Sequence, residues 1–293
     1  MNQEHYLDLQ LRKLIKRKIR GILSNFVMDS LTYVKIRNSN GRIRRYKKSS
    51  SGQILVLASG PSLGDSIKKW NKIEKTGESY VMGINNQILY EEELGIRFTH
   101  YVLADPFYFE DFDYPSAQKQ AGYSERYTQE EYEKERAECL KVLSMLSSRK
   151  IECYVPYWAE EFCSQMKLND FRIFCDRARA SSNNLTDPSR TLGIRPLTGY
   201  MGIAIANYIG FESIYIAGFD NNTWKTLSRN PISRRLEYTY SHFFSEPTSL
   251  TKRELEYFTT SELLGSAASI HRIHEAIKEE IQFINLDDSS LSA

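Results

Sequence analysis

The chain has 293 residues, of which 41% are apolar and 26% are charged, a composition typical of a globular protein with a large core. This excludes a disordered, collagen-like or disulfide-framed chain. No apolar run approaches the roughly 20 residues of a membrane-spanning helix, and no apolar segment follows the N-terminus, so we expect no cleaved signal peptide. The four cysteines lack the Cys-x-x-Cys spacing, which indicates thiols in a reducing compartment and no metal site.

The net charge of +2 conceals a basic N-terminal head. Residues 1–50 contain 13 Lys and Arg against 3 Asp and Glu, which leaves 26 basic and 34 acidic residues for the rest. Apolar residues recur at roughly helical spacing over 7–23, with Lys and Arg between them. Such a helix suits an anionic membrane surface, bound through residues 1–25; packing on the body or on a partner subunit is the alternative. Nucleic acid is disfavoured because the basic run lacks interleaved aromatic residues.

The remainder, residues 51–293, is expected to form one α/β domain, preceded by a head and linker over 1–50. Apolar runs predict strands and helical spacing predicts helices. The expected strands are 54–58, 80–84, 99–104, 151–155, 171–175, 213–217 and 281–286, and the expected helices are 63–70, 129–147, 198–210 and 261–280. Strands separated by helices imply a Rossmann-like, doubly wound, mostly parallel sheet.

Two polar and aromatic segments interrupt this pattern, at 107–150 and 221–260. We expect both to act as lid-like segments over the strand ends, and we expect no clear strand in 221–260. His271 and His274 fall on the late helix, where we expect them to be half-exposed.

Polar residues follow four of the expected strands: Ser59-Gly60, Asn85-Asn86, Asp105-Pro106 and Gly218-Phe219-Asp220. In a parallel sheet these strand ends meet at one edge, where ligands bind at the switch point of the strand order. The sequence therefore predicts a small-molecule site there. The start of a helix at Gly60-Pro61-Ser62 would offer N–H groups to a phosphate, although a plain strand-to-helix turn explains the same residues. The loop is neither a Walker A nor a G-x-G-x-x-G motif, which disfavours ATP and NAD.

The polar side chains at these strand ends each have two interpretations. Asn85 and Asp105 suit hydrogen bonds to a sugar or base, or else a helix cap and a turn before proline. Asp220 suits a ribose or a metal, but no second carboxylate follows two residues later. His242 is placed to act as a general base if its segment covers the site; a structural role is the alternative.

The motifs in series resemble bacterial sialyltransferases of glycosyltransferase family 42 and their wider relatives, over roughly residues 53–245. The resemblance is carried by Leu57-Ala58-Ser59-Gly60-Pro61-Ser62-Leu63, Asn85-Asn86-Gln87, Asp105-Pro106, Thr198-Gly199-Tyr200-Met201 with Ala204-Ile205-Ala206, and Ile214-Tyr215-Ile216-Ala217-Gly218-Phe219-Asp220. It implies a GT-A-variant-like domain with a lid, and metal-independent, inverting transfer of a nonulosonic acid from a CMP-activated donor. By position in the motifs, the donor-binding residues would be Ser59, Gly60, Pro61, Ser62, Asn85, Asp105, Thr198, Gly199, Gly218, Asp220 and Asn222, and the catalytic base would be His242.

Two departures from the family pattern bear on the donor. Asn221, Asn222, Thr223 and Trp224 stand where the family has tyrosines that hold the departing phosphate, and Asp105 stands where an asparagine is usual. These departures leave a donor other than sialic acid, for example another keto-sugar, as an alternative.

The leading hypothesis is thus a sialyltransferase-like enzyme that needs no cofactor or metal. It would transfer a CMP-activated sugar to a bacterial surface glycan or glycolipid, on the cytoplasmic side, peripheral at the inner face of the membrane. Two alternatives stay open. One is an ATP- and Mg²⁺-dependent, pyrophosphokinase-like enzyme that shares the Gly-Pro-Ser-Leu loop. The other is a non-catalytic nucleotide-binding protein.

Overall fold

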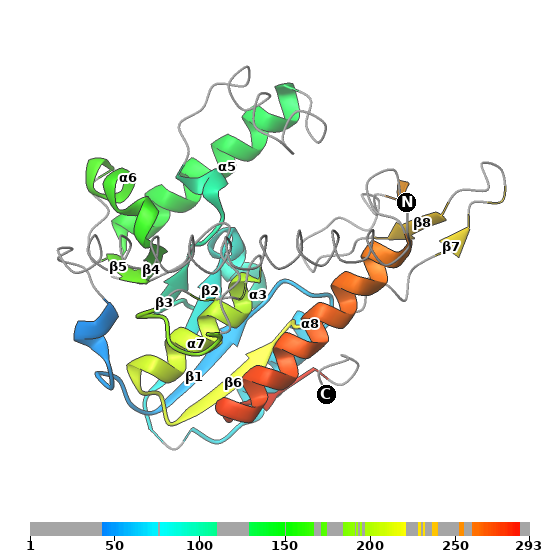
Figure 1. Ribbon diagram of the computed structural model, residues 1–293. Helices are drawn as coiled ribbons and strands as arrows, with labels where there is room; N and C mark the ends of the chain where they lie inside the picture. Colours follow the sequence, from blue (N-terminus) through cyan, green and yellow to red (C-terminus); the bar gives the residue numbers. More distant parts are fainter. Residues whose placement is uncertain are drawn as a thin grey trace, which may run out of the picture.

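The computed structural model of the chain describes residues 43–75, 77–109, 129–149, 151–166, 171–174, 184–190, 192, 194, 197–220, 228–229, 231, 236–239, 252–254 and 260–287. At its centre lies a seven-stranded sheet in the order β10-β6-β1-β2-β3-β4-β5, in which every pairing is parallel (Figure 1). The strands are β1 (Gln53–Leu57), β2 (Ser79–Ile84), β3 (His100–Val102), β4 (Glu152–Pro156), β5 (Phe171–Phe174), β6 (Ser213–Ala217) and β10 (Ile284–Asn285). The predicted Rossmann-like α/β fold is confirmed.

The strand order reverses between β1 and β6. From β1 the chain adds β2, β3, β4 and β5 on one side, then returns to place β6 and β10 on the other. The connecting helices are α2 (Leu63–Lys72), α3 (Glu91–Leu94), α5 (Gln129–Ser148), α6 (Glu160–Gln165), α7 (Thr198–Ile209) and α8 (Thr260–Glu280), with short 3-10 turns η1 (Ile43–Tyr46), η2 (Gln87–Tyr90), η3 (Pro106–Tyr108) and η4 (Tyr157–Ala159). The switch point of the fold therefore lies between the ends of β1 and β6.

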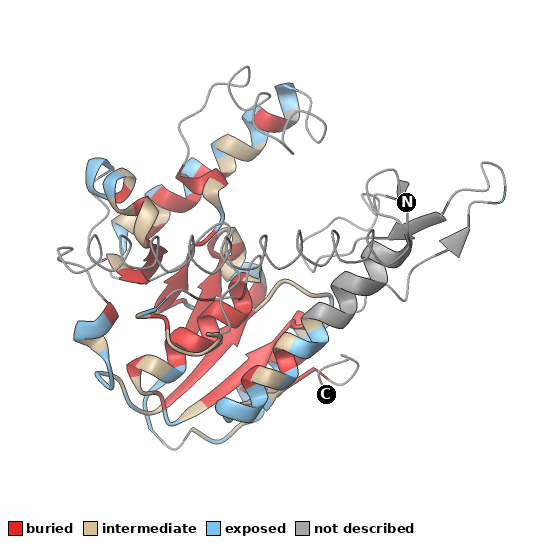
Figure 2. Ribbon diagram, viewed as in Figure 1, coloured by how far each residue is buried: buried red, intermediate tan, exposed pale blue. Residues whose placement is uncertain are grey.

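Helices cover both faces of the sheet, so its central strands are buried on both sides (Figure 2). Successive side chains of β1 alternate between the faces. Ile54 and Val56 join the core that includes residues of α7 and α8, and Leu55 and Leu57 join the core that includes residues of α2 and α5. Burial of each such side chain contributes about 1.5–3 kcal/mol, which explains why continuous apolar runs mark these strands in the sequence.

Helix α7 packs closely on the middle of the sheet because it carries glycine where it faces the strands. A Cβ atom on Gly202 would lie 2.9 Å from Val56 Cγ1 and 3.2 Å from Met82 Sδ. The helix runs back against the direction of the strands, because its last residues precede the start of β6. Its first residue, Thr198, therefore lies at the carboxyl edge of the sheet.

Three predictions about local structure were wrong. Residues 221–260 contain three short strands, β7 (Ser228–Arg229), β8 (Leu236–Thr239) and β9 (Lys252–Glu254), which form a small antiparallel sheet. They were missed because none contains a continuous apolar run. The last strand is only two residues long, since Ile281 still donates to the α8 carbonyl of Ile277. His274 is fully buried, because it shares a helix face with Ile277 and Ile281.

Residues 43–50, expected in the linker, pack on the body of the protein. Ile43 is buried in the core beside α7, and the guanidinium of Arg172 on β5 lies 3.7 Å from the centre of the Tyr46 ring. The backbone N–H groups of Lys48 and Ser50 donate to the carbonyls of Tyr208 and Ile209 at the end of α7. The two-part division of the chain, the lid role of 107–150 and 221–260, and the membrane role of residues 1–25 stay predictions, and residues 1–25 lie outside the described residues.

Candidate functional site

The carboxyl edge of four neighbouring strands brings the predicted polar residues together. Ser59 follows β1, Asn85 follows β2, Asp105 follows β3 and Asp220 follows β6, and these strands are adjacent in the order β6-β1-β2-β3. Thr198 and Gly199 join them from the start of α7. A Cβ atom on Gly199 would lie 2.9 Å from the Phe219 ring and 3.4 Å from Ala58 Cβ. Residues distant in sequence thus line one edge, as the sequence predicted.

The loops after β1 and β6 are in direct contact at the switch point. The N–H of Gly60 donates to the carbonyl of Gly218 over 2.8 Å. Gly218 has a φ of +75°, and a Cβ atom there would lie 2.4 Å from the Ala58 carbonyl oxygen. A Cβ atom on Gly60 would lie 2.4 Å from Asp220 Oδ2 and 2.6 Å from the Gly218 carbonyl oxygen. Only glycine fits at either position, so the two loops form a tightly closed pair.

The start of α2 is occupied by carboxylates of the chain itself. The N–H of Ser62 donates to Asp220 Oδ2 over 2.8 Å, and the Ser62 hydroxyl donates to Asp287 Oδ1 over 2.7 Å. A carboxylate at a helix N-terminus is stabilised by the free N–H groups and the helix dipole. Both polar groups of Ser62 that were expected to meet a phosphate therefore have partners in this structure, and the ligand contact of Ser62 stays a prediction.

Asp287 belongs to this edge and was missed in the sequence. It follows β10, is 3% exposed, and accepts four hydrogen bonds. Its donors are the Ser62 and Ser66 hydroxyls, both at 2.7 Å, and the N–H groups of Gly218 and Phe219, at 2.9 and 2.7 Å. The rule that found the other four positions, a polar residue directly after a strand, would have found Asp287 as well. Asp287 directly follows the strand expected over 281–286.

Asn85 is held in an uncommon backbone conformation. Its φ is +50°, in the left-handed region that asparagine tolerates better than most residues. The Tyr101 hydroxyl donates to the Asn85 carbonyl over 2.7 Å, and burial raises the pKa of Tyr101 well above its ordinary value, so that hydroxyl keeps its proton. The side-chain Oδ1 of Asn85 is buried and has no hydrogen-bond partner among the described residues. An unsatisfied acceptor of this kind is costly, and it is suited to a donor from a ligand.

Gln87 connects the loops after β1 and β2. Its Oε1 accepts the N–H of Ile84 over 2.9 Å, while its Nε2 donates to the Ala58 carbonyl over 3.0 Å and to the Ser59 hydroxyl over 3.4 Å. The side chain is fully buried. Gln87 therefore fixes the spacing between Ser59 and Asn85, and its part in the motif is structural.

Asp105 is exposed and caps the short turn η3. One of its oxygens, Oδ1, accepts the N–H of Phe107 over 3.0 Å. The turn is also bonded to α5, because Arg136 of that helix donates to the Phe107 carbonyl over 2.8 Å. The capping role proposed as an alternative is thus present, and it leaves the Oδ2 oxygen without a partner among the described residues.

The start of α7 offers donors at the same edge. The N-cap residue of this twelve-residue helix is Leu197, whose side chain makes no capping bond, and Thr198 and Gly199 are both buried. The first N–H groups of a helix have no partner within it and carry the positive end of its dipole. The edge thus combines side-chain acceptors on the strand ends with backbone donors on α7, a pattern that suits a ligand bearing both hydroxyl and anionic groups.

Several expected site residues are not placed here. Pro61 is exposed in the turn between β1 and α2, whereas Asn222 and His242 lie outside the described residues. The roles assigned to these residues stay predictions.

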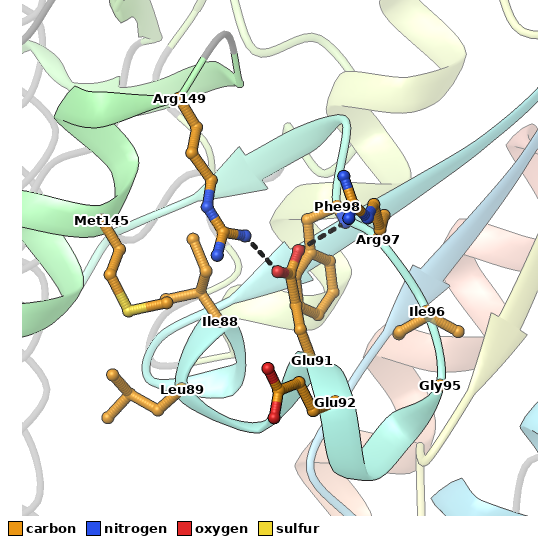
Figure 3. A pocket seen from close by; sticks show the side chains of 10 residues that line it. All are labelled: Ile88, Leu89, Glu91, Glu92, Gly95, Ile96, Arg97, Phe98, Met145 and Arg149. Atoms are coloured by element: carbon orange, nitrogen blue, oxygen red, sulfur yellow. Dashed lines mark hydrogen bonds and ion pairs between the residues drawn. The ribbon is translucent and has the colours of Figure 1, made fainter.

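A pocket of about 690 Å³ lies elsewhere, between α3 and α5 (Figure 3). Ile88, Phe98 and Met145 line it together with Arg97 and with Glu91, which is ion-paired with Arg149. The lining residues come from η2, α3, the segment before β3 and the end of α5. None of the predicted site residues lines it, so this pocket is separate from the carboxyl edge.

Two negative findings apply to the described part of the chain. Its histidine, cysteine, aspartate and glutamate residues form no group of three that could hold a metal ion. None of its helices is long and apolar enough to cross a membrane.

Comparison with known proteins shows a low likeness of fold. No protein family and no curated protein sequence matches the chain. The MAf glycosyltransferase from Magnetospirillum magneticum AMB-1 has a TM-score of 0.39 and 14% identity, over 88% of this chain and 37% of that one. The sialyltransferase CstII from Campylobacter jejuni, solved with the substrate analogue cytidine-5'-monophosphate, has a TM-score of 0.37 and 13% identity over 82% of each chain.

A mammalian sialyltransferase has a TM-score of 0.31 and 10% identity, over 83% of this chain and 82% of that one. The chain spans 37% of the length of the MAf glycosyltransferase. These similarities to glycosyltransferases concern the overall fold, so the function has to be inferred from the residues of this chain.

Proposed function

We propose that the chain is a glycosyltransferase-like enzyme that binds a nucleotide-activated sugar at the carboxyl edge of β6, β1, β2 and β3. The observation that carries the proposal is the buried Oδ1 of Asn85, which has no hydrogen-bond partner within the described part of the chain and belongs to a residue held at a φ of +50°. The acceptor oxygens Asn85 Oδ1 and Asp105 Oδ2, to which no described residue donates, suit the hydroxyl and amino donors of a sugar, a ribose or a base. The start of α7, where the N-cap residue Leu197 makes no side-chain capping bond, suits a phosphate group.

In its finer form, the donor is a CMP-activated nonulosonic acid and the acceptor is a bacterial surface glycan or glycolipid. The series of motifs from Ser59 to Asp220 supports this choice, since their order along the chain fits the sialyltransferase-like pattern. Ser59, Gly60, Pro61, Ser62, Asn85 and Asp105 would surround the donor, together with Thr198, Gly199, Gly218, Asp220 and Asn222.

The proposed mechanism is a direct displacement with inversion. Neutral His242 accepts the proton of an acceptor hydroxyl as that oxygen forms a bond to the anomeric carbon of the donor. The bond from the anomeric carbon to the phosphate oxygen breaks, and the electron pair leaves with CMP. The first N–H groups of α7 would stabilise the charge that develops on the departing phosphate.

The basic head would hold the enzyme at the inner face of the membrane. Residues 1–25 combine apolar residues at helical spacing with Lys and Arg, which suits an anionic lipid surface. Deletion of 1–25 is expected to weaken binding to anionic liposomes and to leave activity on a soluble acceptor intact. Unchanged liposome binding would remove the membrane role.

Ligand binding tests the site. Thermal unfolding should be followed with CMP, CMP-sugars, UDP- and GDP-sugars and Mg-ATP. CMP without added metal is expected to raise the melting temperature, because a ligand that binds only the folded state stabilises it. A shift with Mg-ATP and none with CMP would instead favour the pyrophosphokinase-like alternative. Binding without turnover of any donor would favour the non-catalytic alternative.

A pair of variants assigns the binding to Asn85. Asn85→Gly removes the side-chain amide and keeps the left-handed backbone accessible, so affinity for CMP or its sugar should fall by about 3–10-fold, the value of one hydrogen bond. Asn86→Gly is the matched control, because Asn86 has a φ of −91° and makes no side-chain capping bond. Equal affinities for the two variants would refute the assignment.

The catalytic base has a separate test. His242→Ala is expected to abolish transfer while CMP binding is retained, since the residue would act on the acceptor rather than hold the nucleotide. Full activity of this variant would remove His242 from the mechanism.

A further inference from the structure

We propose that Asp287 is a positioning residue of the carboxyl edge, which holds the segment 218–220 against the start of α2 and thereby sets the place of the Asp220 carboxylate. The inference rests on the proposed function in taking this edge as the ligand-binding one. Asp287 is brought to the edge by β10, a strand of only two residues that pairs with β6.

The contacts of Asp287 connect three separate parts of the chain. Its Oδ1 accepts from the Gly218 N–H and from the hydroxyls of Ser62 and Ser66, while Oδ2 accepts from the Phe219 N–H, all between 2.7 and 2.9 Å. One carboxylate therefore connects the end of β6 with the first turn of α2. Hydrogen bonds to an ionised acceptor are roughly twice as strong as neutral ones, and with 3% exposure the carboxylate is shielded from water.

These contacts determine the position of Asp220. The two N–H groups held by Asp287 belong to the two residues immediately before Asp220. On the other side, Asp287 holds the hydroxyl of Ser62 while Asp220 holds the N–H of the same residue. Both carboxylates thus accept hydrogen bonds from Ser62. Removal of Asp287 releases the end of β6 and the loop before α2, which together fix Asp220.

Ser66 separates the positioning role from a general contribution to stability. Its hydroxyl donates to Asp287 Oδ1 over 2.7 Å and to the Leu286 carbonyl over 3.2 Å, from inside α2 and away from 218–220. Ser66→Ala therefore removes a buried bond to the same carboxylate without touching the segment that carries Asp220. Asp287→Asn keeps the size of the side chain but turns one acceptor oxygen into a donor that conflicts with the N–H groups it faces.

The experiment measures amide exchange and CMP affinity in the full-length protein, well below the melting temperature of every variant. Hydrogen exchange of a peptide covering 214–220 is expected to accelerate at least tenfold in Asp287→Asn and less than threefold in Ser66→Ala. The dissociation constant for CMP is expected to rise at least tenfold in Asp287→Asn and less than twofold in Ser66→Ala. Ser62→Ala removes one donor from the loop and should raise the dissociation constant for CMP about threefold. This variant takes the place of Asp287→Asn if Asp287→Asn does not fold.

The outcomes separate this inference from the function on which it rests. Unchanged exchange over 214–220 in Asp287→Asn overturns the inference, and so does an affinity loss that is equal in Asp287→Asn and Ser66→Ala. Should Asp287→Asn not fold, equal CMP affinities of Ser62→Ala and Ser66→Ala overturn it. If the wild-type protein binds no nucleotide or nucleotide sugar, the proposed function fails, while the exchange experiment still decides whether Asp287 fixes the segment.

Discussion

Substitution of Gly60 by alanine should test the closed pair of loops at the switch point. The new Cβ atom would lie 2.4 Å from Asp220 Oδ2, 2.6 Å from the Gly218 carbonyl oxygen and 2.8 Å from Asp220 Cβ. All three distances are shorter than a carbon atom tolerates, and one of the neighbours is backbone that cannot rotate away. The loop after β1 must therefore move away from the loop after β6.

The magnitude follows from what this movement breaks. Overpacking of a tight site costs about 1–3 kcal/mol. The bond from the Ser62 N–H to the Asp220 carboxylate is worth a further 1.5–3 kcal/mol or so, and the neutral bond from Gly60 to Gly218 about 1 kcal/mol. Reduced freedom of the unfolded chain returns about 0.4–1 kcal/mol. Because the clash is relieved as the bonds break, we expect a net loss of about 3 kcal/mol.

Chemical denaturation followed by tryptophan fluorescence measures this loss, since Trp70 is buried on α2 in contact with the Tyr215 ring of β6. Gly77→Ala is the matched control, because no atom lies within 4 Å of the Cβ position there. The control should change the free energy of unfolding by less than about 0.5 kcal/mol. A Gly60→Ala protein within about 1 kcal/mol of the control would refute the close contact between the two loops.

Three further predictions concern the described core. Tyr101→Phe should lower the free energy of unfolding, measured by urea denaturation, by about 2 kcal/mol, because the Tyr101 hydroxyl donates to the Asn85 carbonyl and accepts from the Ile88 N–H. Tyr108→Phe is the control, which loses no hydrogen bond with the described residues and should leave the stability nearly unchanged. Burial raises the pKa of Cys139 and of Cys163 to about 12, so both thiols should resist iodoacetamide at pH 8 in the folded protein and react after unfolding; rapid native labelling would contradict this. Their raised pKa also predicts that stability falls as pH rises above 9, where only the unfolded thiols ionise. Burial opposes the ionisation of Glu152, but contacts with His100 and Arg172 lower its pKa on balance below 4.5. Glu152→Gln should therefore be less stable than wild type at pH 7, and the difference should shrink at pH 3, where the wild-type carboxylate becomes protonated. Equal differences at both pH values would refute the ion-pair role.

The sequence predicted the parallel sheet well, because burial on both faces produces continuous apolar runs. Ser213–Ala217 was expected with its observed bounds, and Gln53–Leu57 within one residue. The same rule failed for β7, β8 and β9, since short strands of a small antiparallel sheet carry no such run.

For the site, the sequence predicted that Ser59, Asn85, Asp105 and Asp220 gather at the edge, but it did not predict Asp287 or how these residues bond to one another. That Asn85, Asp105 and Asp220 meet there follows from parallel topology alone. The hydrogen bonds of Ser62 with Asp220 and Asp287 depend on the geometry of the turn after β1 and of the end of β10. The contact of Ser62 with Asp220 joins residues that are 158 positions apart in the sequence, and its contact with Asp287 joins residues that are 225 positions apart. No local sequence pattern can reveal contacts of this range.

The attachment of residues 43–50 determines where this segment lies relative to the candidate site. Lys48 and Ser50 are bonded to the last turn of α7, whereas Thr198, at the first turn, lies at the carboxyl edge of the sheet. Twelve residues of helix separate these ends by about 18 Å. Lys48 and Ser50 are thus fixed at the opposite edge of the sheet from the strand ends, one helix length away from the candidate site.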